Sequence, residues 1–302
     1  MSGQTPSHSR NLRQVMAQHP LFFFFLIAYA FSWIMSIPYI LGQWNVWQGN
    51  FMIIFAIKSF GPCLAGFIMF GVTEGKAGVL ALRKRCVQVR AGWQWYLFIL
   101  VGIPALSLLG ILILPGALAS FQGFPPHFPF VYLVSFVLIF FAGGPLGEEP
   151  GWRGFALPRM QPRYGALRGT LLLGILWTCW HLPDFLTDAQ RGGPGTDLTR
   201  LLTVNFPIFL VMVVAMAVIF TWVFNHTGGS VFMAMLLHTS INTFGIVQPL
   251  FTAPSVVNTD LFMCISFVVP AVLVIVFTRG QLGYKPGADQ PQAAGAEVLP
   301  AA

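Results

Sequence analysis

The chain has 302 residues, of which 56% are hydrophobic and only 8% are charged. Since a soluble domain carries about 25% charged residues, this composition excludes an ordinary soluble globular protein and indicates a membrane protein. We interpret the net charge of +7 as a sign of how the chain is oriented in the membrane. No basic stretch is interleaved with aromatic residues as in a nucleic-acid-binding groove, so we expect no nucleic-acid partner.

Eight apolar runs predict an all-α, polytopic membrane bundle of about eight transmembrane helices. Each run is close to the roughly 20 residues that an α-helix needs to cross the hydrocarbon core of a bilayer. The runs lie near residues 21–41, 51–71, 95–115, 129–147, 168–186, 203–224, 229–247 and 261–278. We therefore expect a multi-pass protein in contact with membrane lipids, in the plasma membrane if the chain is bacterial.

The basic residues predict the orientation of this bundle. Lys and Arg gather in 1–20, 72–94 and 148–168, whereas the intervening loops contain few of them. Because Lys and Arg are enriched in cytoplasmic loops, both termini are predicted to be cytoplasmic. The predicted organisation is a cytoplasmic N-terminal segment at 1–20, a transmembrane domain at 21–278 with its motifs within 145–245, and a disordered cytoplasmic tail at 279–302.

The first group of ionisable residues follows the fourth apolar run, at Gly147 to Arg153. On a helix, Arg153 lies four residues after Glu149 and can meet it on the same face. Glu148 is rotated by about 100° and points elsewhere. One carboxylate can then stay ionised beside the arginine while the other faces a cavity as a general base. The alternative is a solvated acidic turn at the edge of the membrane.

Two further polar groups lie inside apolar runs. His181 follows Trp177 by one helical turn, and His238 and Asn242 are spaced to share one face of the seventh run. The alternatives are a packing histidine at 181 and interhelical hydrogen bonding at 238 and 242. Ionisable residues within membrane segments are costly and are functional candidates by default. The combined set could activate water and stabilise an oxyanion.

In order along the chain, these motifs are E-E-x-x-x-R at Glu148 to Arg153, an aromatic-x-x-x-H at Trp177 to His181, and H-x-x-x-N at His238 to Asn242. Together they resemble the CPBP family of intramembrane proteases, which includes type II CAAX prenyl endopeptidases and bacteriocin-processing relatives. The resemblance implies an endopeptidase that cleaves a peptide bond near the cytoplasmic leaflet. Its substrate would be a peptide or protein, with a C-terminal or prenylated segment as one option.

The resemblance also implies a role for each motif residue. Glu148 would activate water, and His181 would help to hold that water. His238 and Asn242 would line an oxyanion hole, and Glu149 with Arg153 would fix the geometry of the first motif. We favour this glutamate mechanism without a cofactor. The alternative is a zinc metalloprotease in which Glu148, His181 and His238 would be the ligands.

Glu148 and His181 can lie at the same depth in the membrane only under one of two conditions. His181 lies 13 residues past Arg168, or about 20 Å along a helix, whereas Glu148 ends the fourth run. Either the fifth helix begins well outside the bilayer, or the stretch 143–145 (Gly-Gly-Pro) breaks the fourth helix and lets Glu148 sit deeper. We favour the break.

Two other functions compete with the protease. A non-catalytic binding or bacteriocin-immunity protein could use the same scaffold, with the polar cluster holding a ligand. A small-solute transporter would predict internal repeats and paired broken helices, and the sequence displays neither.

Overall fold

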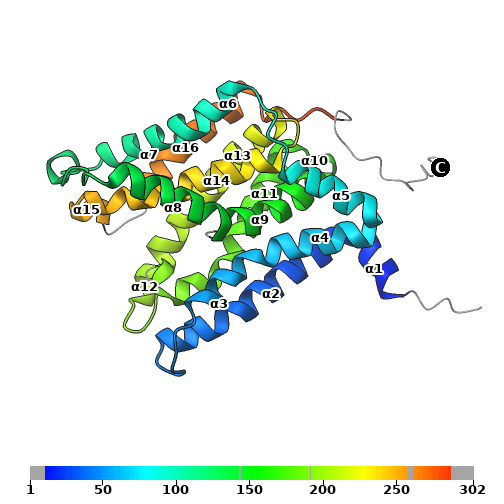
Figure 1. The fold of residues 1–302 in the computed structure, drawn as a ribbon, viewed down its shortest axis with the longest axis horizontal. Helices are drawn as coiled ribbons and strands as arrows, with labels where there is room; N and C mark the ends of the chain where they lie inside the picture. The colour runs from blue at the N-terminus through cyan, green and yellow to red at the C-terminus, as the bar shows by residue number, and fades with distance from the viewer. Residues whose placement is uncertain (1–10, 143, 191, 258–260, 287–302) are drawn as a thin grey trace, which may run out of the picture.

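The computed structural model of the chain describes residues 11–142, 144–190, 192–257 and 261–286. These residues confirm the all-α prediction: they form helices and no strand, apart from an isolated bridge between Phe121 and Phe251. Figure 1 shows the helices arranged as a bundle, with α9, α11, α13 and α14 in its interior.

The α-helices in chain order are α1 (Leu12–Gln18), α2 (Pro20–Gln43), α3 (Met52–Ile57), α4 (Gly61–Thr73), α5 (Gly75–Cys86), α6 (Trp93–Leu97), α7 (Ile103–Leu112), α8 (Phe128–Ala142), α9 (Pro145–Gly151), α10 (Leu157–Tyr164), α11 (Ala166–Trp180), α12 (Leu198–Arg200), α13 (Phe206–His226), α14 (Val231–Thr243), α15 (Pro254–Val257) and α16 (Leu261–Phe277). Short 3-10 or π segments extend or join them: η1 (Lys58–Phe60), η2 (Phe98–Gly102), η3 (Leu118–Ser120), η4 (Trp152–Ala156), η5 (Leu182–Leu186), η6 (Asp188–Gln190), η7 (Leu201–Asn205), η8 (Phe244–Ile246) and η9 (Gln248–Leu250).

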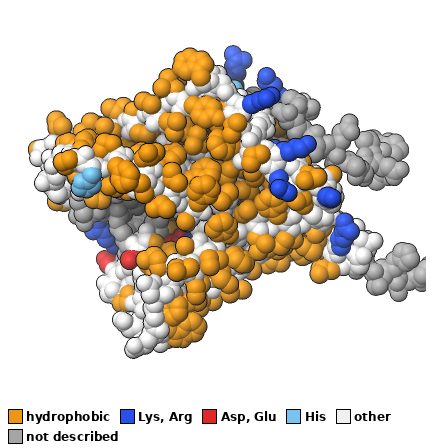
Figure 2. Space-filling view, in the orientation of Figure 1, with side chains coloured by type: hydrophobic (Ala, Val, Ile, Leu, Met, Phe, Trp, Pro, Cys, Tyr) orange, Lys and Arg blue, Asp and Glu red, His pale blue; other side chains and the backbone are white. Residues whose placement is uncertain are grey.

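Several of these helices are long and apolar enough to cross a membrane. Within the described residues there are five of them, or six if the bent pair formed by α8 and Pro145–Tyr164 counts as one span. The predicted count of eight is therefore not confirmed. The predicted spans near 168–186 and 261–278 correspond to α11 and α16, which have 15 and 17 residues. Figure 2 shows hydrophobic side chains over much of the visible surface, as a multi-pass membrane protein requires.

The chain breaks between α8 and α9, as the sequence indicates. α8 ends at Ala142, α9 begins at Pro145, and the two arms are bent by 44°. Gly144 has a φ of 111°, a conformation that glycine adopts far more readily than other residues. The break places Glu148 in the first turn of a new helix, where its backbone N–H donates to the Gly144 carbonyl at 2.8 Å.

Small residues hold α9 tightly against α4. A Cβ atom at Gly147 would lie 2.5 Å from the Ser59 carbonyl oxygen, and one at Gly151 would lie 2.2 Å from the Pro62 carbonyl oxygen. Such small-xxx-small spacing lets helix backbones approach closely in membranes. The contact fixes the backbone on either side of Glu148 and Glu149.

The described ends of the chain lie at the same end of the bundle (Figure 1). Leu282 is buried and its carbonyl accepts a hydrogen bond from Asn225 in α13 at 2.9 Å. The first part of the predicted tail thus folds back onto the bundle. Residues 287–302 of that tail and residues 1–10 of the predicted N-terminal segment lie outside the described residues.

Candidate active site

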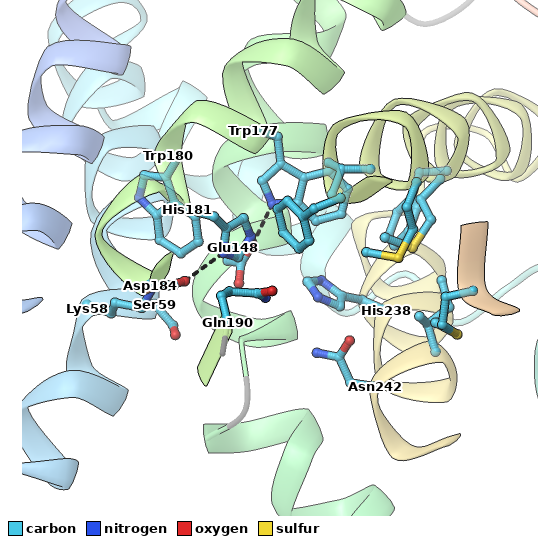
Figure 3. Close-up of a pocket in the computed structure, with 17 residues that line it drawn as sticks. Lys58, Ser59, Glu148, Trp177, Trp180, His181, Asp184, Gln190, His238 and Asn242 are labelled. Atoms are coloured by element: carbon cyan, nitrogen blue, oxygen red, sulfur yellow. Dashed lines mark hydrogen bonds and ion pairs between the residues drawn. The ribbon is translucent and has the colours of Figure 1, made fainter. Parts of the chain in front are cut away.

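A cavity of about 300 Å³ lies between α9, α11, α13 and α14. Four of the predicted site residues line it: Glu148, His181, His238 and Asn242. Figure 3 shows these side chains around one space, although they come from three separate helical segments. The structure therefore brings these four residues of the three motifs to one cavity, and the favoured break before Glu148 is present between α8 and α9.

Glu148 is 4% exposed and is held by two indole rings. Its Oε2 atom accepts hydrogen bonds from Trp177 Nε1 at 2.8 Å and from Trp152 Nε1 at 3.3 Å. Its Oε1 atom faces Gly144, where a Cβ atom would lie only 2.7 Å away. The carboxylate is thus fixed through one oxygen and directs the other toward the cavity.

Glu149 forms the buried half of the first motif. It is fully buried and accepts hydrogen bonds from Arg153 Nη1 at 3.0 and 3.1 Å, as the i,i+4 spacing predicts. The same carboxylate lies 2.8 Å from Nδ1 of His238 in α14. Glu149 therefore does not face the cavity as a base; it joins the arginine to the imidazole.

The Arg153 guanidinium lies between two aromatic rings. Its Cζ atom is 4.2 Å from the Trp177 ring centroid and 4.0 Å from that of Phe220. Nε and Nη2 are buried and form no hydrogen bond within the described residues. Contacts between a guanidinium and aromatic faces are favourable when they are desolvated. They compensate in part for these unused donors.

His181 belongs to a second chain of polar groups. Its Nδ1 atom lies 2.8 Å from Asp184 Oδ2, and Asp184 Oδ1 forms an ion pair with Lys58. The Lys58 ammonium also lies 4.6 Å from the Trp180 ring centroid. Lys58 and Asp184 are both about 5% exposed, and both line the cavity together with His181 (Figure 3).

Both histidines use Nδ1 for a carboxylate. An ionised carboxylate only accepts hydrogen bonds, so each Nδ1 carries the proton. Nε2 is then the ring nitrogen left for the cavity. It accepts a hydrogen bond when the imidazole is neutral and donates one when it is protonated. His238 and Asn242 project from the same side of α14 toward this space (Figure 3).

A wider cavity of about 520 Å³ adjoins the first one. The two share six lining residues: Gln190, Phe209, Met212, Ile241, Asn242 and Met263. Beyond them the wider cavity is lined by Asp188, Ala189, Gly245, Gln248 and Phe262. The shared walls combine methionine and aromatic side chains with two amides, which suits an apolar segment whose backbone still needs hydrogen-bond partners.

The residues do not fit a metal centre in this arrangement. Within the described ranges, no group of three His, Cys, Asp or Glu side chains is placed to hold one metal ion. The metalloprotease alternative with Glu148, His181 and His238 as ligands is therefore not supported.

Sequence reasoning missed Lys58, Asp184 and Gln190. Lys58 could have been found, because it is an isolated charge within an apolar run, where ionisable residues are costly. Asp184 follows His181 by three residues and comes directly after a proline, but a single acidic residue in this position forms no distinctive motif. Gln190 ends the short 3-10 segment η6, and nothing in its sequence context places it beside the cavity.

Comparisons with known proteins agree with the resemblance seen in the motifs. Residues 130–244 match the family described as type II CAAX prenyl endopeptidase Rce1-like. The chain is also similar to a protein named CAAX prenyl protease 2 from Methanococcus maripaludis, with 30% identity over 146 residues, or 46% of this chain. The aligned part covers 51% of that relative, so the match spans about half the length of the archaeal protein. The family match includes all six predicted site residues.

Proposed function

We propose that this multi-pass membrane protein, with its Rce1-like segment at residues 130–244, is an intramembrane endopeptidase that hydrolyses a peptide bond with water activated by Glu148. This proposal rests on the position and hydrogen bonds of the Glu148 carboxylate. It is nearly buried, its Oε2 is bound by two indoles, and it lines a cavity with two imidazoles and an amide.

The base in this mechanism is Oε1 of Glu148. With Oε2 held by Trp177 and Trp152, Oε1 is oriented to accept a proton from a water molecule in the cavity. A neutral His181 offers its Nε2 lone pair to the same water, because Nδ1 is bound to Asp184. Positioned proton transfer of this kind contributes roughly 10²–10⁴-fold to a rate.

The oxyanion that forms on the scissile carbonyl is stabilised by His238 and Asn242. An amide N–H donates without any change of charge, whereas Nε2 of His238 donates only from the imidazolium form. The Glu149 carboxylate accepts from Nδ1 of the same ring and so fixes its orientation. Hydrogen-bond donors aimed at a developing oxyanion are typically worth about 10²–10³ in rate each.

The substrate is proposed to be a peptide or protein segment that reaches the cavity within the membrane. The relative from Methanococcus maripaludis is named as a CAAX prenyl protease, so a C-terminal or prenylated substrate is one form of this proposal. The apolar wall of Phe209, Met212 and Met263 provides contact area for either an aliphatic side chain or a lipid chain.

A non-catalytic binding or immunity protein is the competing function. The experiment that separates the two is hydrolysis of membrane-derived peptides, prenylated and unprenylated, by the purified protein. The proposal expects cleavage that is lost in Glu148→Ala and in His238→Ala. Cleavage retained by either variant contradicts the catalytic assignment, and binding without cleavage by the folded wild-type protein supports the rival. Membrane peptides that accumulate uncleaved in cells lacking the protein would then identify the substrate.

A further inference from the structure

One end of the bundle carries most of the basic side chains. Figure 2 shows Lys and Arg gathered at the end where α5 and α10 lie in Figure 1. Contacts join the segments of this end: Arg85 in α5 donates to the carbonyls of Gly154 and Gly229, and Arg159 in α10 pairs with Glu74. By the positive-inside rule this basic end faces the cytoplasm.

The site residues lie well away from that end on every helix that supplies them. At 1.5 Å per residue, His181 is about 20 Å along α11 from Arg168, and Asn242 is about 18 Å along α14 from Ser230. Glu148 is at the start of the helical segment whose other end, near Arg163, is basic. By the same measure His238 is about 12 Å from Ser230. In a hydrocarbon core about 30 Å thick, the site therefore spans the middle of the membrane, with His181 and Asn242 on the side remote from the basic end.

The wider cavity lies farther still from the basic end. Asp188, on its rim, is bonded to Gln43 through Gln43 Nε2 at 2.6 Å and through its own backbone N–H at 2.9 Å. Gln43 is the last residue of α2, whose 24 residues span about 36 Å. The helix begins at Pro20, next to the arginine-containing α1. The rim therefore lies at the opposite end of a membrane-spanning helix from the basic residues.

We infer that the cavity opens on the extracytoplasmic side of the membrane. Its substrate is then a polypeptide segment presented from that side, such as the outer end of a membrane-anchored or exported chain. The amides of Gln190, Asn242 and Gln248 and the apolar walls favour an extended segment with apolar side chains, and Asp188 adds one carboxylate at the rim. This inference rests on the proposed function for its substrate, and it replaces the cytoplasmic-leaflet position expected from the family resemblance.

Cysteine labelling tests the side of the opening without reference to hydrolysis. The four native cysteines, Cys63, Cys86, Cys179 and Cys264, are first replaced by serine or alanine. Gly245→Cys then introduces a thiol at the cavity rim, where a Cβ atom meets nothing within 4 Å. Lys84→Cys introduces one on the exposed surface of the basic end. A membrane-impermeant maleimide is applied to intact cells and to inverted membrane vesicles, with labelling in detergent as the reference for full reaction.

The inference expects Gly245→Cys to be labelled in intact cells, and Lys84→Cys to be labelled only in inverted vesicles. Labelling of Gly245→Cys only in inverted vesicles, or labelling of both thiols from the same side, overturns it. So does protection of Gly245→Cys from both sides with full reaction in detergent. The pattern must be the same when Glu148→Gln is added, because accessibility does not depend on catalysis. A loss of cleavage with the labelling unchanged would count against the proposed function alone.

Discussion

Nδ1 of His238 lies 2.8 Å from Oε1 of Glu149, although the two residues are 89 positions apart in the chain. The bond joins α14 to α9, and through Arg153 it extends to the rings of Trp177 and Phe220. The second glutamate of the motif therefore contacts a histidine of α14, while the first lines the cavity.

Removing the arginine should destabilise the fold. Arg153→Met leaves the Glu149 carboxylate buried with only His238 as a partner, and breaking a buried ion pair typically costs about 3–5 kcal/mol. We expect a clear drop in the thermal unfolding midpoint of the purified protein. Because the guanidinium lies between two aromatic rings, Arg153→Lys should not restore stability fully.

The double variant Glu149→Gln with Arg153→Met is the control for this explanation. It removes both charges, so it should be more stable than Arg153→Met alone. If the double variant is at least as unstable as the sum of the two single variants, the ion pair is not the reason for the instability.

Asp184 should act through His181. Asp184→Asn keeps the shape of the side chain but removes the charge that orients Nδ1 and pairs with Lys58. Outer-shell partners of metal-bound histidines are typically worth about 10–100-fold in activity, and we expect the same order for a histidine that holds water. We expect kcat to fall by that order with a smaller change in KM and a shift in the pH profile of kcat. A variant with an unchanged pH profile and kcat would show that Asp184 only stabilises the loop.

Gly144 should tolerate no side chain. In Gly144→Ala, the new Cβ atom would lie 2.7 Å from Glu148 Oε1 and 3.9 Å from His238 Cε1. Activity should therefore be largely lost. Gly123→Ala is the matched control, since Gly123 also has a positive φ but a Cβ atom there meets nothing within 4 Å. Both variants carry the same kind of backbone strain, and only the first should abolish cleavage.

Metal dependence can be measured directly. We expect no stoichiometric zinc by elemental analysis of the purified protein, and activity that survives treatment with a chelator. One zinc per chain, lost together with activity when the chelator is added, would instead establish a metalloprotease.

The fold class and the convergence of the motifs were predictable from the sequence because both depend on local patterns. Long uncharged runs determine which segments enter the membrane, and the i,i+4 spacing of Glu149 and Arg153 determines their pairing. The helix break at Gly144 was also predictable, since glycine followed by proline favours a break at this point.

Features that depend on packing between distant segments were not predictable. The bond from Glu149 to His238 and the pairing of Lys58 with Asp184 both join segments far apart in the chain. The span count also differs, since α11 and α16 are shorter than their apolar runs. A run of apolar residues gives no indication of where its α-helix ends and a 3-10 segment such as η5 begins.

The central claim is that the Glu148 carboxylate activates the water that cleaves the substrate. The most direct test is the cleavage rate of purified Glu148→Gln, which keeps the size and hydrogen-bonding shape of the side chain but cannot take up a proton as a base. Glu74→Gln, at the basic end, is the matched control. We predict that Glu148→Gln folds like the wild type and loses about 10²–10⁴-fold in rate, while Glu74→Gln remains active. A folded Glu148→Gln variant that cleaves the substrate as fast as the wild type would contradict this claim.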